Sequence, residues 1–189
     1  MTRKTDSHWI WEPYSTERGM AFATEIAGLD GEVQRRVLRG EPLDRIRKLT
    51  VTETTAGRFY DVLGPPVGVL FVSPALRQVL EESPGGHFQF VPPDVRGQPE
   101  LRYFLVNVLD TVPAIDLERS KVEVFPGTDA IRRIQLLRLR PIPPDAPPIF
   151  HAAEDPTMIL VSDDLQRRLA RASRHPGVLK PADKYRNEY

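Results

Sequence analysis

The chain contains no cysteine among its 189 residues. It can therefore form no disulfide, no thiolate nucleophile and no cysteine-ligated metal site. Long apolar runs are missing as well, since no stretch reaches the roughly 18 residues that a membrane-spanning helix needs. Residues 1–13 hold no apolar run of the length found in a signal peptide. We therefore expect a cytoplasmic protein with no membrane partner.

An excess of either charge is also missing. Lysine plus arginine and aspartate plus glutamate number 26 each, so the formal net charge is zero. A balanced chain exerts no general attraction on nucleic acid or on an anionic membrane. We expect no nucleic-acid partner. The length fits one domain with a substantial core.

Familiar catalytic and cofactor motifs are absent from the sequence. It has no Walker loop, no G-x-S-x-G, no H-E-x-x-H and no G-x-G-x-x-G. No histidine lies two to four residues from another, so histidine pairs with metal-ligand spacing are missing. The four histidines are His8, His87, His151 and His175. The prominent serines, Ser73 and Ser162, are explained as helix caps. We predict that the protein is not an enzyme and has no catalytic residues, cofactor or metal.

A group of acidic residues leaves one catalytic alternative open. Paired carboxylates can act as general acid and base in glycoside or phosphate chemistry. The candidates are Asp110, Asp116, Glu118 and Glu123, with Arg132 as a possible helper. Nothing in the sequence sets their pKa values or supplies a nucleophile. A small hydrolase is therefore an alternative, and the acids are interpreted first as structural.

Proline, by contrast, is abundant, with 19 residues that cluster at 65–66, 92–93 and 141–148. Such clusters interrupt helices and central strands, which excludes a bundle of long helices. Alternating apolar patterns predict many short strands. These cover residues 8–12, 19–26, 45–52, 58–63, 69–72, 87–91, 103–109, 131–140 and 159–161, with further strand pattern from 121 and from 149. We predict a single α+β domain with a mostly antiparallel sheet and two or three short helices.

One local pattern occurs twice. Val-Ser-x-x-Leu-x-x-x-Leu stands at 72–80 and again at 161–169. In each copy a short strand leads into a serine with the properties of an N-cap, followed by apolar residues at helical spacing. We predict two strand-to-capped-helix units. An internal duplication and the repeated use of a common local motif explain the pattern equally well.

Two groups of side chains allow either a binding or a structural interpretation. Trp9 and Trp11 share one face of a predicted strand, and we favour burial over a ligand-stacking platform. Arginines on the predicted helix at 32–39 and on the predicted strand at 131–140 could contact an anion. We favour exposed positions for both sets, with ion pairs to Asp116, Glu118 or Glu123 for the second. The arginines are Arg35, Arg36, Arg39, Arg132, Arg133, Arg138 and Arg140.

The stretch 102–125 is the most informative part of the chain. Its apolar run at 103–109 predicts a buried strand, and the sequence Asp-Thr-Val-Pro at 110–113 predicts a turn. An acidic crossing with Asp116 and Glu118 then leads to a second strand from Lys121. We divide the chain into a β-rich N-terminal part at 1–66, an α+β core at 67–180 and a loose polar tail at 181–189, all within one globular domain.

The order of these segments resembles a known family. The strand and helix at 71–80, the run Y-x-L-x-N-V-L and the later A-x-D-x-E-x-S within 103–120, and the strands near 131, 149 and 159 resemble the Imm11 immunity proteins. The resemblance covers about residues 67–178. It implies a protein that binds and neutralises a cognate toxin encoded by an adjacent gene. It brings no catalytic or ligand residues, and it implies structural roles for Asn107, Asp116 and Glu118.

An adaptor or chaperone for a secreted effector is a second possibility of the binding class. An adaptor would bind the protein encoded by the same adjacent gene without neutralising it. The sequence does not locate the interface. We expect the proline-bounded loops at 92–100 and 141–148, or the N-terminal third, to carry specificity.

Overall fold

The computed structural model describes residues 7–12, 19–44, 48–64 and 68–186. The helices are α1 Gly31–Leu38, α2 Pro74–Glu81, α3 Asp163–Ala172 and the short 3-10 helix η1 Ala182–Lys184. The strands are β1 His8–Glu12, β2 Ala23–Ala27, β3 Thr50–Thr54, β4 Val62–Leu63, β5 Leu70–Val72, β6 Phe88–Val91, β7 Asp94–Val95, β8 Phe104–Val108, β9 Thr111–Val112, β10 Lys121–Val124, β11 Ile131–Leu136, β12 Ile149–Ala152, β13 Asp155–Ser162 and β14 Val178–Pro181. Most strand pairs are antiparallel, so the predicted α+β class is confirmed.

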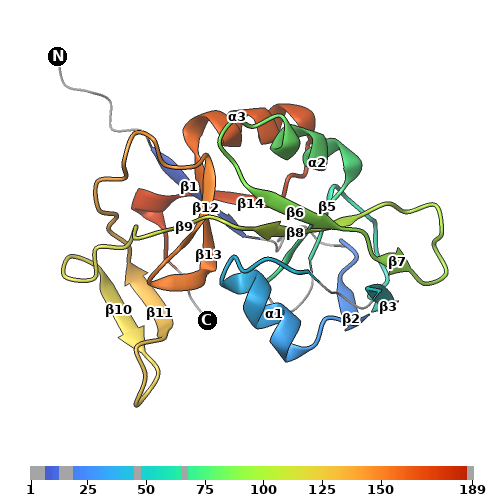
Figure 1. The fold of residues 1–189 in the computed structure, drawn as a ribbon, viewed down its shortest axis with the longest axis horizontal. Helices are drawn as coiled ribbons and strands as arrows, with labels where there is room; N and C mark the ends of the chain where they lie inside the picture. The colour runs from blue at the N-terminus through green and yellow to red at the C-terminus, as the bar shows by residue number, and fades with distance from the viewer. Residues whose placement is uncertain (1–6, 13–18, 45–47, 65–67, 187–189) are drawn as a thin grey trace.

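Two sheets form the centre of the fold. One has the order β4-β5-β8-β6, and the other has the order β14-β1-β13-β12-β9. Helices α2 and α3 lie side by side along one side of the molecule (Figure 1). Between the helices and the sheets lies a shared apolar core. It includes Trp11, Val72, Leu76, Leu80, Val106, Val161, Leu165 and Leu169.

The two central sheets repeat one topology. In the first, β4, β5, α2 and β6 follow one another, and β8 lies between β5 and β6. In the second, β12, β13, α3 and β14 follow one another, and β1 lies between β13 and β14. The inserted strand is antiparallel to both of its neighbours in each sheet. The second unit therefore takes its inserted strand from the N-terminal end of the chain.

The pairing registers of the two units also agree. Val72 of β5 pairs with Phe104, and Val161 of β13 pairs with Trp9. At the other edge of each inserted strand, Phe90 pairs with Val106 and Leu179 pairs with Trp11. Phe90 follows Val72 by 18 residues, and Leu179 follows Val161 by the same 18. Identical spacing and register favour an internal duplication over two uses of a local motif.

The helix starts confirm the capping prediction. The Ser73 hydroxyl accepts a hydrogen bond from the Leu76 amide at 3.4 Å. The Ser162 hydroxyl accepts one from the Leu165 amide at 3.2 Å. Each bond satisfies one of the amides that a helix leaves without a partner in its first turn. Both serines are thus accounted for by local structure.

Each central sheet buries its second face against different elements. The outer face of the β5 sheet packs on α1, Leu49, β3 and the Tyr103 side chain, through Leu63, Phe71 and Leu105. The outer face of the β13 sheet packs on residues 114–115, 134–137 and 182–185, through Ile10, Phe150 and Leu160. Because both faces of each central sheet are covered, the sequences of its strands are continuous apolar runs.

The stretch 102–125 differs in part from its prediction. The buried strand is confirmed as β8. The predicted turn at 110–113 is wrong, because Thr111 and Val112 form β9 and pair in parallel with His151 and Ala152. The predicted second strand is confirmed as β10. The parallel partner strand lies about 40 residues away in sequence, so no local pattern could indicate this pairing.

Residues 114–140 form one long hairpin. Its base is paired through Ile115 and Leu139, and through a 2.9 Å bond from the Asp116 amide to the Arg138 carbonyl. Its outer part is the pair β10–β11. The predicted strand 131–140 therefore ends at Leu136. The alternation of this segment slips at Leu136-Leu137, which predicts a bulge or burial on both faces. A bulge is present close to that place, with Gln135 left between paired neighbours.

The prediction of a loose polar tail at 181–189 is wrong for most of these residues. Pro181 belongs to β14, and Ala182 and Tyr185 are buried with 1% and 7% exposure. Residues 181–185 are therefore attached to the core through Ala182 and Tyr185 and are not a loose tail. Residues 187–189 lie outside the described residues. The strand predicted at 45–52 is also displaced, because β3 covers Thr50–Thr54 and residues 45–47 lie outside the described residues. Of the strand predicted at 58–63, only β4 forms.

Candidate functional site

The four candidate acids are not brought together. Asp110 holds His87, with 2.9 Å between Oδ1 and the ring Nδ1 and 3.1 Å between Oδ2 and the His87 amide. Glu123 accepts a 2.6 Å hydrogen bond from the amide of Gln135 across the hairpin. Asp110 and Glu123 therefore bond to different residues in different parts of the fold, which is not the paired arrangement of a general acid and base.

Asp116 and Glu118 have different environments. The Asp116 carboxylate accepts a 3.1 Å hydrogen bond from the Arg119 amide and lies 3.8 Å from the Arg119 guanidinium. It therefore caps the one-turn loop that follows the hairpin base. Glu118 is exposed and makes no hydrogen bond or ion pair within the described residues. Asp116 is structural, whereas Glu118 faces solvent.

The hairpin arginines do not form the expected ion pairs. Arg140 lies 3.6 Å from Glu154 and donates through Nε to the Ile115 carbonyl at 3.0 Å. The other Glu154 oxygen accepts from the Ala114 and Ile115 amides at 3.1 and 3.0 Å. The expected pairing with Asp116, Glu118 or Glu123 is therefore wrong for Arg140. Sequence reasoning missed Glu154, because it lies 39 residues from the nearer amide that it holds.

The histidines are separate as well. Within the described ranges, no group of three or more His, Cys, Asp or Glu side chains could hold a metal ion. His151 is 2% exposed, and among the described residues neither of its ring nitrogens has a hydrogen-bond partner of good geometry. Burial lowers the pKa of His151 to about 4, against a smaller opposing effect of the Pro156 backbone. The ring is therefore neutral at pH 7.

The densest polar network surrounds Asp61, which sequence reasoning did not single out. Its Oδ1 accepts from the Ser73 hydroxyl and its Oδ2 from the Ser173 hydroxyl, both at 2.6 Å. The Tyr103 hydroxyl donates to the Tyr60 carbonyl at 2.5 Å. Burial, followed by the nearby Asp61 charge, raises the pKa of Tyr103 to about 12. Both serine protons are directed at one carboxylate, so the network joins the segments that carry Asp61, Ser73 and Ser173.

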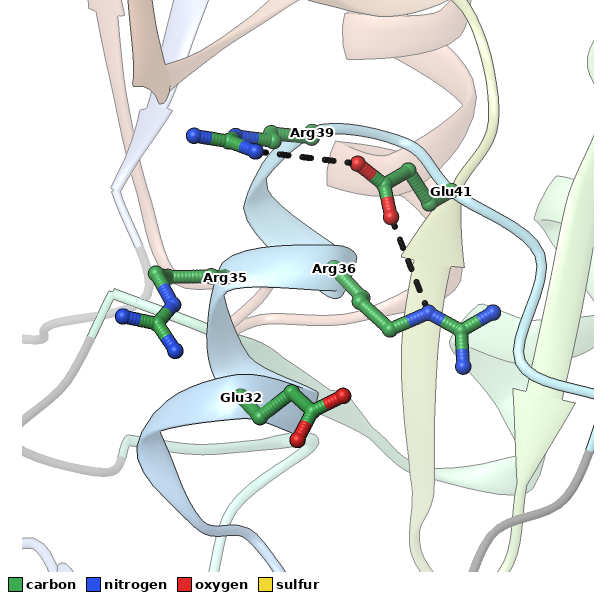
Figure 2. Close-up of a pocket in the computed structure, with 5 residues that line it drawn as sticks. All are labelled: Glu32, Arg35, Arg36, Arg39 and Glu41. Atoms are coloured by element: carbon green, nitrogen blue, oxygen red, sulfur yellow. Dashed lines mark ion pairs between the residues drawn. The ribbon is translucent and has the colours of Figure 1, made fainter.

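The arginines of α1 line an open polar depression together with Glu32 and Glu41 (Figure 2). Glu41 lies 3.6 Å from Arg36 and 3.9 Å from Arg39. Figure 2 shows Arg35 extending from the opposite side of the helix without an ion pair to the residues drawn. Glu41 pairs with two of the three arginines and Glu32 adds a second carboxylate, so the depression is a mixed-charge surface rather than a purely basic one. This agrees with the predicted solvated helix face.

The two tryptophans are part of the interior. Trp11 is 1% exposed, and Trp9 packs against the same core. Their indole nitrogens donate to the Pro176 carbonyl at 2.6 Å and to Asp163 at 3.1 Å. Both indoles are thus satisfied within the fold, as buried tryptophans require. They do not form a ligand-stacking platform.

Exposed apolar side chains are concentrated on the hairpin. Among the described residues, the large apolar side chains that are exposed are Leu117, Val124 and Phe125, at 45%, 48% and 50%. All three lie between the base of the hairpin and its tip. A contact surface is the kind of site that these residues can form.

Comparison with protein families identifies the chain. A model described as an immunity protein family, Imm11, matches residues 33–183. The chain belongs to the Imm11 family of immunity proteins. The match covers both repeated units except for β1, which lies before it. It also begins earlier than the resemblance at 67–178 and takes in most of α1 and all of β3, which pack on the β5 sheet.

Membership in Imm11 supports an immunity function of the inhibitor type. Among curated proteins, no match to the chain is found. In the part of the chain that the structure describes, no helix combines the length and apolar character needed to cross a membrane. The binding partner that an immunity protein implies is a toxin.

Proposed function

We propose that this Imm11 protein neutralises a cognate bacterial toxin by stoichiometric binding. The complex would cover the toxin's active site or another surface that the toxin needs. The observation that carries this proposal is the family match over residues 33–183. The partner would be encoded by an adjacent gene in a polymorphic toxin system, and neutralisation would take place in the cytoplasm of the producing cell or its kin.

The described residues are consistent with a binding protein. Asp110, Asp116 and Glu123 are committed to contacts with other residues of the chain, whereas Glu118 faces solvent. The hairpin, in contrast, exposes apolar side chains. We therefore propose inhibition without catalysis by the immunity protein itself.

Co-expression with the product of the adjacent gene tests the proposal. Cells carrying both proteins should survive, and the purified complex should contain the two chains in a fixed ratio with the toxin inactive. Binding without survival would instead indicate an adaptor for the effector. Absence of both binding and survival would reject the immunity role.

A triple substitution tests whether protection depends on chemistry. Asp116→Ala, Glu118→Ala and Arg132→Ala together remove the side chains that a small hydrolase would use. If protection is stoichiometric, a folded triple variant that still binds the toxin should still protect the cell. Loss of protection without loss of toxin binding would indicate that the protein acts as an enzyme.

A further inference from the structure

The hairpin 114–140 carries a surface that the rest of the fold leaves uncovered. Its outer part, β10–β11, projects from the body of the molecule (Figure 1). Its base is fixed by Glu154, which holds the Ala114 and Ile115 amides, and by Arg140 on the opposite leg. The hairpin is therefore an extension with a firm attachment to the core.

An apolar stripe continues along the hairpin from the core to the tip. Near the base, Val122 pairs with the fully buried Ile134, and both belong to the core under the β13 sheet. Further out, Val124 pairs with Ile131, and Phe125 follows. Val124 and Phe125 are about half exposed. The stripe is thus covered by this chain in its inner half and uncovered in its outer half.

The tip is also held in one conformation. The Phe125 amide donates to the Ala130 carbonyl at 3.0 Å, and the Thr128 amide donates to the Phe125 carbonyl at 3.1 Å. Gly127 has φ +76°, a conformation that glycine adopts without steric cost. An aromatic side chain on an ordered turn loses little conformational entropy on binding, which favours an anchor.

We propose that Val124 and Phe125 anchor the toxin by inserting into an apolar cleft on it. This inference rests on the proposed immunity function and adds the location of the contact. Asp129 and Arg132 lie next to Ala130 and Ile131 on the facing leg of the tip, are exposed and make no ion pairs within the described residues. They fit the polar rim that surrounds an interface core.

The size of the tip favours a concave partner over a second copy of this chain. A stable interface buries roughly 800 Å² on each partner. Two tips in a symmetric contact would bring together only a few half-exposed side chains on each copy. A narrow hairpin that enters a cleft is contacted on several sides, so the same residues bury more area there.

The test uses the full chain and the purified product of the adjacent toxin gene. Val124→Ser combined with Phe125→Ser should weaken binding at least about 10-fold, because central aromatic anchors dominate interface energies. Its melting temperature should stay within about 2 °C of wild type, since both side chains are exposed. Arg96→Ala combined with Gln98→Ala, in the exposed loop after β7, is the matched control and should bind like wild type.

The outcomes separate the two proposals. Wild-type neutralisation with unchanged affinity of the Val124/Phe125 variant would overturn the tip as the anchor and leave the immunity function standing. Loss of affinity in the loop variant alone would place the contact at 92–100 instead. A wild-type dimer that the tip variant dissociates would assign the tip to self-association. Absence of wild-type binding would reject the immunity function and the anchor with it.

Hydrogen exchange gives a second readout that does not depend on a variant. In the wild-type complex, amides of 121–130 should exchange more slowly than in the free protein. Unchanged exchange at the tip, together with protection elsewhere, would overturn the proposal.

Discussion

The carboxylate of Asp61 accepts a 2.6 Å hydrogen bond from the hydroxyl of Ser173, which lies 112 residues further along the chain. The second oxygen accepts an equally short bond from Ser73, at the start of α2. Ser73 belongs to the first repeated unit, and Ser173 follows the helix of the second. One side chain thus connects the two halves of the duplicated core.

Asp61→Ala should therefore lower the free energy of unfolding by about 2–3 kcal/mol. The substitution removes two hydrogen bonds to a charged group and leaves both hydroxyls without their acceptor. Urea unfolding measures the change. Asp94→Ala is the control, because it breaks the 2.5 Å ion pair with Lys48 between two exposed side chains. Such pairs contribute less than about 1 kcal/mol, and equal losses in the two variants would contradict a bridging role.

Trp11→Ala should cost about 3–5 kcal/mol of stability, as the loss of a large buried aromatic side chain does. Trp11 is 1% exposed and lies on the strand inserted between β13 and β14. Thermal or urea unfolding gives the value. Trp9→Ala, on the same face of β1 but only partly buried, should cost clearly less. A small effect of Trp11→Ala would mean that β1 is dispensable for the second unit.

Acid should destabilise the protein through His151. Its pKa falls from 6.5 to about 4 on folding because the ring is buried. The unfolded chain therefore binds a proton that the folded chain rejects, and stability falls as the pH drops from about 6.5 to about 4. Below both pKa values the free energy of unfolding is lower by about 3 kcal/mol, because each unit of pKa difference corresponds to about 1.4 kcal/mol. Unfolding measured across this pH range gives the slope.

His151→Leu isolates that contribution. The substitution removes the proton-binding group, so the stability lost between pH 6.5 and 4 should be smaller than in wild type. Asp155 is the main opposing group nearby in sequence: burial raises the pKa of its carboxyl, so it adds stability as the pH falls. Because Asp155 is present in both proteins, the difference between the two pH profiles belongs to His151. Parallel profiles would exclude it as the source.

Glu154→Ala should loosen the hairpin while the rest of the fold remains intact. Glu154 accepts from two backbone amides at the hairpin base and pairs with Arg140. Without it, hydrogen exchange of the amides at 114–116 and 138–140 should accelerate. Glu123→Ala removes only a contact to Gln135 on the exposed part and should leave the base unchanged. Uniform acceleration across all elements would show that Glu154 supports the whole fold.

Local features of the molecule could be predicted from sequence. The serine caps of α2 and α3, the apolar strand β8 and the bulge in β11 depend on residues close together in the chain. Burial of Trp9 and Trp11 followed from their alternation, and the family signature followed from the order of such segments. The structural interpretation of Asp116 rested on the same local patterns, whereas Glu118, interpreted in the same way, faces solvent.

Long-range contacts required the tertiary structure. Several contacts join residues that lie far apart in sequence: the β9–β12 pairing, the packing of 181–185, and the hydrogen bonds of Asp61 and Glu154. The energy of each contact depends on the partner as well as on the residue itself. The repeated motif was visible at 72–80 and 161–169, yet the matching registers became evident only once β1 was found inserted in the second sheet. The exposed tip was hidden for the same reason: alternation shows that Val122 and Val124 share a face, but only the folded body determines which of them it covers.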